Sequence, residues 1–286
     1  MATGLILEGG AMRGIYTAGV LDEFMKEGIT FPGVIGVSAG AVHGCSYVAG
    51  QRGRSIRYYL RYCGDKRFMS ARSLVTTGNI VGEQFCYHDL PERLDPFDYE
   101  GFQKSGTNFY VVCTNVRTGK AEYILCKDMR ADIDYMRASA SMPFVSRIVH
   151  TGGKKLLDGG VADSVPVQAF RRLGYEKNVI VLTRPADYRK KLGSTTRRLA
   201  RVMYRRYPAF ERAIMNRHKE YNGTLEEINR LEKAGEVFVI RPEESLKLGR
   251  AETDREKIRA VYQIGVRDAR RRMEALRAFL GQTSRT

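Results

Sequence analysis

The sequence predicts an α/β fold in which helices cover one sheet, and three observations support this prediction. The first half of the chain alternates short apolar or β-branched runs with stretches of helical pattern. Glycine-rich segments stand where the first two of these runs meet the helices that follow. The length of 286 residues suits one main core, because a single core stops growing at about 250 to 300 residues.

The expected elements of the first hundred residues follow from these patterns in chain order. Apolar runs predict strands at residues 4–8 and 31–37. Each run leads into a helical stretch, at residues 14–27 and 39–50. Residues 51–106 carry aromatic and Arg residues without a clean period, so we expect helix and loop there.

The middle of the chain predicts a hairpin followed by a helix. Two β-like runs, at residues 108–115 and 121–126, are joined by a turn-rich segment that suits a hairpin. A helix is expected over residues 132–141, ending before Pro143, since proline cannot continue a helix.

The last predicted strands are short, and the remainder is mostly helical. Leu156 and Leu157 predict a strand that leads into an Asp-Gly-Gly segment, and residues 179–182 predict another. From about Tyr188 the pattern is helical and basic, with one strand at residues 236–240.

Composition narrows the class of protein. Hydrophobic content of 43% and charged content of 28% are those of an ordinary globular domain. The N-terminus lacks the pattern of a signal peptide, and no window has the roughly 20 apolar residues of a membrane span. The five cysteines are an odd set without a Cys-x-x-Cys pair. We therefore expect reduced thiols, a cytoplasmic protein and no metal site.

The net charge of +16 is concentrated in the C-terminal part of the chain. Residues 184–220 hold twelve Lys or Arg against three acids, and a second basic run spans residues 255–277. Such a field favours anionic partners, namely a phospholipid membrane, nucleic acid or a phosphorylated substrate. Nucleic acid is not expected, because no motif for its recognition is present.

The segment Gly36-Val37-Ser38-Ala39-Gly40 is a G-x-S-x-G pentapeptide between a predicted strand and a predicted helix. A nucleophile elbow requires this context, since flanking glycines relieve crowding at the sharp turn and the Ser hydroxyl projects from the sheet. The alternative is a glycine-rich turn in which Ser38 merely caps the helix. Taken alone, the pentapeptide does not decide between these interpretations.

A second glycine-rich segment, residues 9–14, also lies between a strand and a helix. A Walker A loop is excluded because Ile15 and Tyr16 stand where Lys and Ser or Thr are required. A dinucleotide fingerprint would need glycine in place of Ala11. An oxyanion hole made of backbone N–H groups remains.

Asp158-Gly159-Gly160 follows a short apolar strand, so the Asp158 carboxylate has free approach to a neighbouring side chain. This placement suits a base, although Asp-Gly is also a common turn dipeptide. Asp163 is the nearest rival, but its setting before Val165-Pro166 is that of a turn or helix-capping residue.

In this order and spacing the three segments resemble those of the patatin-like phospholipases. The similar stretches are the loop at residues 9–14, the pentapeptide around Ser38, the Asp158 motif, and the small-residue stretch 138–143 before it. The resemblance covers about residues 4–182. One departure is Ala11, which stands where the family usually has a third glycine.

The resemblance implies a three-layer α/β/α sandwich of the patatin type. Residues 1–187 would form the hydrolase core, and residues 188–286 a basic, mostly helical C-terminal region packed on it. The implied activity is lipid acyl hydrolysis of phospholipase, lysophospholipase or carboxylesterase type, without a metal or an organic cofactor. The substrate would be a lipid or other acyl ester. The basic residues 184–220 would hold the enzyme against the inner surface of an anionic membrane, or they would form a solvated charge face that only aids solubility.

The resemblance also implies a role for each residue of the three segments. Ser38 would be the nucleophile and Asp158 its partner base, with no catalytic histidine. The other residues would form the oxyanion hole (Gly9, Gly10, Ala11 and Met12) or support the site (Arg13, Gly14, Gly36, Gly40, Gly159 and Gly160). For Arg13 we expect a part in shaping the loop rather than contact with substrate.

Two alternatives remain open from the residues alone. An ordinary α/β-hydrolase triad would run from Ser38 through an acid to His218, which is the chain order of that fold. The other alternative is a basic binding protein with a vestigial hydrolase site. The complete Ser, Asp and Gly set speaks against lost chemistry.

Overall fold

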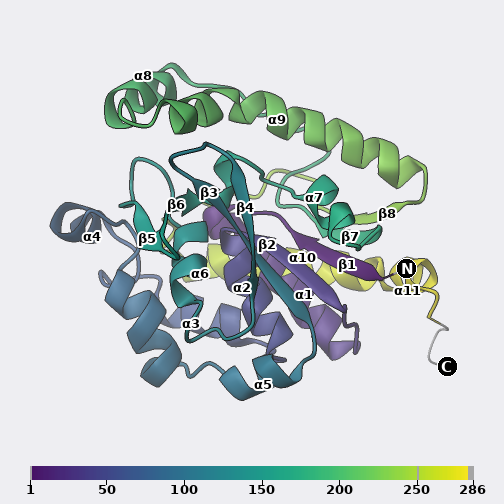
Figure 1. The fold of residues 1–286 in the computed structure, drawn as a ribbon. Coiled ribbons are helices and arrows are strands. Elements are labelled where there is room, and N and C mark those ends of the chain that lie inside the picture. Colours follow the sequence, from purple (N-terminus) through teal and green to yellow (C-terminus); the bar gives the residue numbers. More distant parts are fainter. Residues whose placement is uncertain (1, 250, 283–286) are drawn as a thin grey trace.

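A single eight-stranded sheet forms the centre of the computed structural model, which describes residues 2–249 and 251–282 (Figure 1). The strand order is β5-β6-β3-β2-β1-β7-β8, with β4 paired to β3. Strands β3, β2, β1, β7 and β8 lie in this order and are parallel to one another. Strands β4, β5 and β6 are antiparallel to their neighbours. The bounds are β1 Thr3–Leu7, β2 Gly33–Val37, β3 Asn108–Asn115, β4 Ala121–Cys126, β5 Val149–Thr151, β6 Lys154–Asp158, β7 Lys177–Val181 and β8 Val237–Ile240.

Helices cover both faces of this sheet. The α-helices are α1 Gly14–Lys26, α2 Ala39–Val48, α3 Arg54–Tyr62, α4 Ala71–Thr77, α5 Tyr99–Lys104, α6 Ile133–Ser139, α7 Val167–Arg172, α8 Ser194–Met203, α9 Pro208–Lys233, α10 Arg255–Arg271 and α11 Met273–Leu280. Two short 3-10 helices, η1 Ala11–Arg13 and η3 Gly159–Val161, and the π-helix η2 Phe85–Leu94 complete the set. No helix in the described part of the chain is long and apolar enough to cross a membrane.

Successive side chains of the central strands enter two different cores. Leu5 and Leu7 of β1 belong to a core shared with α1, α2 and α10, whereas Ile6 points into one shared with α7 and α9. Because side chains alternate across a strand, a strand buried on both faces must be apolar throughout. The result is a three-layer α/β/α arrangement, with α8 and α9 running along one side of the sheet (Figure 1).

The C-terminal region is built into both outer layers and into the sheet. Strand β8 pairs in parallel with β7, and α10 packs along α1. A Cβ on Gly19 would lie 2.2 Å from the Tyr262 carbonyl oxygen, and one on Gly265 would lie 2.1 Å from the Tyr16 carbonyl oxygen. Glycine at both positions therefore allows the two helix backbones to touch. The Tyr16 hydroxyl also donates a 3.1 Å hydrogen bond to Asp268.

The predicted α/β fold with a mostly helical C-terminal part is confirmed, and the predicted hairpin is the antiparallel pair β3–β4. Residues 51–106 form α3, α4, η2 and α5 with loops between them, in line with the expectation of helix and loop. Strand β5 and helix α7 were not predicted. Their three and six residues are too short to give a clear period.

Candidate active site

Ser38 lies at the sharp turn between β2 and α2. Its backbone has φ of +55° and ψ of −124°, a strained conformation for any residue other than glycine. The flanking glycines allow this turn, because a Cβ on Gly36 would lie 2.5 Å from the Ala41 Cα and one on Gly40 would lie 2.4 Å from the Leu7 carbonyl oxygen. The local geometry is therefore that of a nucleophile elbow, which is more than a helix cap requires.

A buried serine holds this turn from a third element. The Ser38 backbone N–H donates to the Ser139 Oγ at 2.9 Å, and the Ser139 hydroxyl donates to the Val112 carbonyl oxygen at 2.6 Å. Ser139 is fully buried at the end of α6. It ties the elbow to β3 and fixes the strained backbone.

The Ser38 hydroxyl donates a 2.7 Å hydrogen bond to Asp158 Oδ2. The other carboxylate oxygen, Oδ1, accepts from the Gly160 N–H at 2.8 Å, and the Thr114 hydroxyl donates to the Asp158 carbonyl oxygen at 2.8 Å. Burial raises the pKa of Asp158 above its usual range, although the nearby Arg217 and the bond from Ser38 oppose this rise. The carboxylate is thus fixed in position and more basic than an exposed one.

The loop at residues 9–12 packs directly against Ser38. A Cβ on Gly9 would lie 2.9 Å from the Ser38 Cβ, so only glycine permits this approach. Within the described residues, the backbone N–H groups of Gly10, Ala11 and Met12 donate no hydrogen bond to the protein. They remain free to bind an oxyanion. Ala11 has φ of +48°, a left-handed conformation that an alanine adopts at a cost.

Glu8 anchors this loop to the C-terminal region. Its carboxylate accepts from the Tyr221 hydroxyl at 2.6 Å through Oε1, and from the Thr183 N–H at 2.6 Å through Oε2. Both partners are buried. Helix α9 therefore helps to position the loop, a link that the sequence did not reveal.

The other predicted site residues lie around these three segments. A Cβ on Gly14 would lie 2.6 Å from Ala39, where α1 and α2 begin side by side. Gly159 packs against the β3 backbone, and a Cβ on Gly160 would lie 3.1 Å from Arg217 Nη2. The Arg13 side chain lines a pocket beside Ser38, and its Nε is buried without a hydrogen-bond partner.

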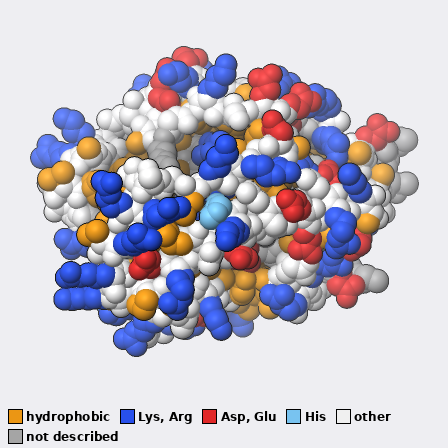
Figure 2. Space-filling model, turned by 90° about the horizontal axis from the view of Figure 1, so that it is seen from above, with side chains coloured by type: hydrophobic (Ala, Val, Ile, Leu, Met, Phe, Trp, Pro, Cys, Tyr) orange, Lys and Arg blue, Asp and Glu red, His pale blue; other side chains and the backbone are white. Residues whose placement is uncertain are grey.

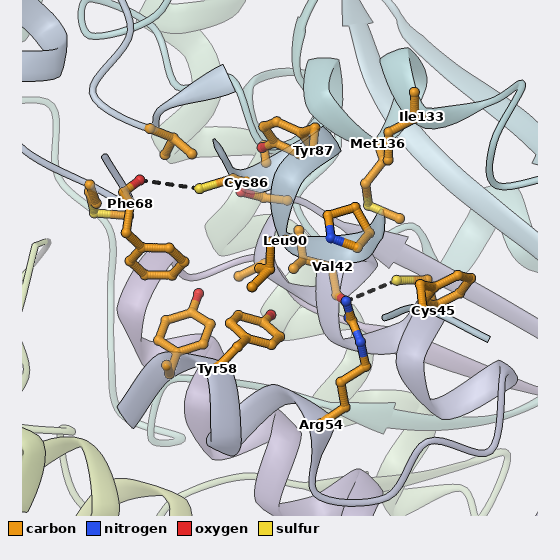
Figure 3. Close-up of a pocket in the computed structure, with 18 of the residues that line it drawn as sticks. Val42, Cys45, Arg54, Tyr58, Phe68, Cys86, Tyr87, Leu90, Ile133 and Met136 are labelled. Atoms are coloured by element: carbon orange, nitrogen blue, oxygen red, sulfur yellow. Dashed lines mark hydrogen bonds between the residues drawn. The ribbon is translucent and has the colours of Figure 1, made fainter. Parts of the chain in front are cut away.

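An apolar pocket opens on one side of Ser38 (Figure 3). It starts at Ser38 and Ala11, and its walls come from α2, α3, η2 and α6. Figure 3 shows these apolar side chains pointing toward one another around the cavity, among them Val42, Tyr58, Phe68, Leu90, Ile133 and Met136. A chain of methylene groups would find a mostly apolar surface here, although Arg54 also lines the pocket.

A polar pocket opens on another side of Ser38. Ser38, Asp158 and residues 8–11 line its floor, and residues of the loop before α8 and of α9 line its wall. Ser38 and Ala11 belong to both pockets. A substrate could therefore place an apolar part and a polar part on opposite sides of the hydroxyl.

Histidines are not arranged as a triad with Ser38. His218 lines the polar pocket, but its Nδ1 is buried without a partner, and no carboxylate of the described residues accepts from its ring. His43 lies 3.0 Å from the Ser55 hydroxyl, and burial lowers its pKa to about 3. Asp163 accepts from the Tyr123 hydroxyl at 2.8 Å and lines a different pocket.

The cysteines and the acidic residues form no metal centre. All five cysteines are free thiols, and four of them are buried. Within residues 2–249 and 251–282, no group of three or more His, Cys, Asp or Glu is placed to hold an ion.

Two family models match the chain. The model described as patatin-like phospholipase matches residues 5–171, and a domain of unknown function, DUF6363, matches residues 207–281. The first match includes the Ser38 elbow, the loop at residues 9–12 and Asp158. The second begins at α9 and covers most of the C-terminal region.

Curated relatives and one solved structure are also similar. The uncharacterized protein YjjU of Escherichia coli is 31% identical over 64% of this chain and 52% of its own length. The lysophospholipase NTE1 of Saccharomyces cerevisiae is 26% identical over 93% of this chain and 16% of its own length. The lysophospholipase nte1 of Aspergillus niger is 28% identical over 60% of this chain and 11% of its own length. The chain thus spans about half of the bacterial relative and a small part of the fungal ones. The crystal structure of VipD from Legionella pneumophila shares the fold, with a TM-score of 0.50 and 12% identity over 96% of this chain and 67% of that one.

Proposed function

The chain belongs to the patatin-like phospholipase family, and from this membership and the geometry around Ser38 we propose that it hydrolyses acyl esters of lipids through a Ser38–Asp158 dyad. Family membership and the lysophospholipase relatives support a lipid ester hydrolase. The serine mechanism rests on one observation, the 2.7 Å hydrogen bond from the Ser38 hydroxyl to Asp158 beside three free backbone N–H groups.

The reaction would proceed in two steps. Asp158 accepts the Ser38 proton as Oγ attacks the ester carbonyl, and the amides of Gly10, Ala11 and Met12 stabilise the negative charge on the carbonyl oxygen. Asp158 then gives the proton to the departing alcohol, which leaves an acyl-enzyme. Water, deprotonated by Asp158, attacks this ester and releases the fatty acid, and the proton returns to Ser38.

Two surfaces favour a lipid as the acyl donor. The apolar pocket accommodates an acyl chain next to Ser38. Helix α8, whose Thr196 lines the polar pocket, exposes Leu199, Val202 and Met203 among arginines. Apolar side chains ringed by positive charge bind the headgroup region of anionic membranes. We therefore include peripheral membrane contact in the proposal, and the free thiols favour a cytoplasmic location.

Labelling and hydrolysis of a short p-nitrophenyl ester test the dyad together. A fluorophosphonate should label the wild-type protein and leave Ser38→Ala unlabelled. Asp158→Asn keeps the shape of the side chain but cannot accept a proton, so kcat should fall by about 100- to 10,000-fold with an unchanged thermal melt.

His218→Gln distinguishes the dyad from a triad. Under the proposal this variant retains most of its activity, because Asp158 bonds Ser38 without an intervening ring. Loss of activity in His218→Gln comparable to that in Asp158→Asn would favour the triad. Persistent labelling of Ser38→Ala would refute the assignment of the nucleophile.

A further inference from the structure

A cationic side chain lies in the wall of the apolar pocket. Among the described residues that line this pocket, Arg54 is the one with a formal charge. The residue is only 5% exposed. Figure 3 shows the Arg54 side chain pointing in among the apolar side chains, between Tyr58 and Cys45. A buried cation costs free energy unless it is paired, so the pairing of Arg54 decides what this wall can bind.

The position of Arg54 sets a length for the pocket. The pocket follows one face of α2, because residues three apart on a helix share a face and this pocket is lined by Ala39, Val42 and Cys45. Arg54 Nη1 donates to the Ser46 Oγ at 3.2 Å, next to the last of these residues. At about 1.5 Å per residue, the guanidinium lies about 10 to 12 Å along α2 from Ser38. An extended carbon chain advances about 1.2 Å per bond, so a chain of about eight bonds spans this distance.

The protein compensates the charge of Arg54 only in part. Both carboxylate oxygens of Asp95 accept from Arg57, at 2.7 Å and 2.8 Å. The Arg54 Nε lies 3.5 Å from the same carboxylate, so two guanidinium groups share one acid. The Arg54 guanidinium also lies 5.4 Å from the centre of the Tyr58 ring and 5.3 Å from that of Phe97, where cation–π attraction is weaker than an ion pair. An anion in the pocket would therefore meet a guanidinium that has no carboxylate of its own.

Arg54 also has unused hydrogen-bond donors. Its Nε and Nη2 donate to the Asp95 carbonyl oxygen at 3.3 Å and 2.9 Å, and its Nη1 donates to Ser46. Each Nη of a guanidinium carries two N–H groups, so one on each Nη has no acceptor in the described part of the chain. Arg54 is moreover the first residue of α3, where the helix dipole favours anions and disfavours cations. The free donors and the helix end both suit an anion that arrives through the pocket.

We propose that Arg54 binds a carboxylate at the far end of the acyl chain, so that the enzyme prefers monoesters of dicarboxylic acids of about nine carbons. This inference rests on the proposed hydrolase function and adds an acyl-chain specificity to it. The ester carbonyl lies at Ser38, the methylene groups follow α2, and the terminal carboxylate accepts from the two Nη atoms of Arg54. A carboxylate suits this place because its hydrogen bonds to a guanidinium are charge-assisted and its planar shape matches two donors.

Two p-nitrophenyl esters that differ only at the far end of the acyl chain test this assignment. One is the nonanoate, which ends in a methyl group, and the other is the monoester of azelaic acid, which ends in a carboxylate. Both are used as monomers near neutral pH, so that recruitment to a surface cannot contribute. The wild-type kcat/KM should be at least about tenfold higher for the azelate, as one charge-assisted hydrogen bond would give. The shorter pair, hexanoate and the monoester of adipic acid, should show no such preference, because the chain ends before Arg54.

Arg54→Met removes the cation and keeps a long side chain in the wall. The ratio of kcat/KM for azelate to that for nonanoate should fall by about tenfold or more, while hydrolysis of the nonanoate persists. Arg54→Lys keeps the charge but loses the paired donors, so it should retain part of the preference. Arg61→Met is the matched control. Arg61 is exposed on the same helix and lies outside the pocket, so its removal should leave the ratio unchanged.

The wild-type comparison decides the proposal even if a variant does not fold, which a thermal melt would reveal. A wild-type ratio near or below one, or the same preference in the shorter pair, would overturn it while the hydrolase function stands. An unchanged ratio in folded Arg54→Met would also overturn it. Loss of the preference in Arg217→Gln but not in Arg54→Met would assign the carboxylate to the polar pocket, against the proposal. No hydrolysis of any of these esters would refute the hydrolase function on which the inference rests.

Discussion

Asp158, the proposed base, combines two properties that such a base would need in the absence of a histidine. Its carboxylate is only 5% exposed, and it is fixed by the Ser38 hydroxyl and the Gly160 N–H. Burial penalises the charged form and so raises the pKa, which makes the carboxylate a better proton acceptor. Arg217 works in the opposite sense and limits this rise in the pKa.

The pH dependence of kcat/KM should report this balance. Asp158 acts in its ionised form, so activity should fall as the pH is lowered through a pKa above the usual aspartate range. Arg217→Gln removes the charge that opposes the rise, and the acid limb should then move to higher pH. A p-nitrophenyl ester assay over a pH series measures both profiles. An acid limb that stays in place in Arg217→Gln would contradict the assignment of Asp158 as the base.

Ala11 carries a backbone strain that glycine would relieve. A left-handed alanine costs about 1 to 2 kcal/mol, and the extra freedom of glycine in the unfolded chain returns about 0.5 to 1 kcal/mol of this. Ala11→Gly should therefore be equally stable or up to about 1 kcal/mol more stable in denaturant titration, with altered kcat because an oxyanion donor has moved. A clear loss of stability in Ala11→Gly would contradict the proposed backbone strain at Ala11.

Gly10→Pro provides the complementary control, because proline has no N–H to donate. If the loop binds the oxyanion, removing one donor should lower kcat by about 100- to 1,000-fold. Full activity in Gly10→Pro would refute the oxyanion assignment.

At this scale the sequence predicted the groups that the structure brings together at the proposed site, but not the residues that hold them in place. Ser38, Asp158 and the loop at residues 9–12 stand in local motifs whose spacing is visible in the chain. Ser139 has no such motif, apart from its place in a stretch of small residues. Lys190 and Arg217 could not be singled out among the twelve basic residues of segment 184–220. Only the fold brings four of these residues, Arg184, Lys190, Lys191 and Arg217, to the polar pocket.

Helix α8 exposes large apolar side chains to solvent. Ala200 and the following Tyr204 are buried, whereas Leu199 is 38%, Val202 66% and Met203 51% exposed. Figure 2 shows Lys and Arg side chains crowding the face of the molecule that carries α8 and α9, with hydrophobic side chains among them. Exposed apolar groups within positive charge are typical of a membrane-binding helix.

Vesicle sedimentation should distinguish the apolar from the electrostatic contribution of α8 to membrane binding. Replacing Leu199, Val202 and Met203 by Ser should weaken binding at low and at high salt, because apolar insertion is not screened. Arg201→Gln with Arg205→Gln should weaken binding to anionic vesicles at low salt, since each basic residue contributes about 1 kcal/mol near such a surface.

The matched control for the arginine pair is Arg255→Gln with Arg259→Gln. These two residues have the same spacing and are exposed on α10, in the opposite layer of the fold. Equal loss of binding in both pairs would show that net charge, and not α8, directs the contact. Equal binding of the unmodified protein to neutral and anionic vesicles would exclude an electrostatic contribution.

Element predictions succeeded where a segment is buried on a regular face. The parallel strands β1, β2 and β7 contain short apolar runs, at residues 5–7, 33–37 and 179–181, because both faces of these strands are covered. The π-helix η2 was not predicted as such, since its i→i+5 hydrogen bonds and its internal Pro91 do not give the hydrophobic period of an α-helix. Side chains of η2 line the apolar pocket. This helix lies within residues 51–106, for which the sequence predicts only helix and loop without clear bounds.

At the scale of the whole molecule, the C-terminal region completes the hydrolase fold. Strand β8 covers the edge of β7, and α10 packs along α1 through the Gly19 and Gly265 contact. The Tyr221 hydroxyl of α9 donates to Glu8, next to the loop at residues 9–12. Separation at residue 187 would therefore divide the sheet and the hydrophobic cores on both of its faces.

We expect that residues 1–187 do not fold alone. The six side chains buried by α9 are Phe210, Ile214, Tyr221, Leu225, Ile228 and Leu231. At about 1.5 to 3 kcal/mol each, losing their burial costs about 10 kcal/mol or more, which is comparable with the entire stability of a domain, about 5 to 15 kcal/mol.

Size-exclusion chromatography and urea titration of the 1–187 fragment would test this, with the full chain as reference. The fragment should aggregate or lack a cooperative transition, because β7 becomes an open edge and an apolar face of the sheet meets water. Adding residues 188–286 as a separate chain should restore some hydrolysis if the two parts still pair. A monomeric 1–187 fragment with a cooperative transition and normal ester hydrolysis would show instead that the C-terminal region is an accessory packed on an independent core.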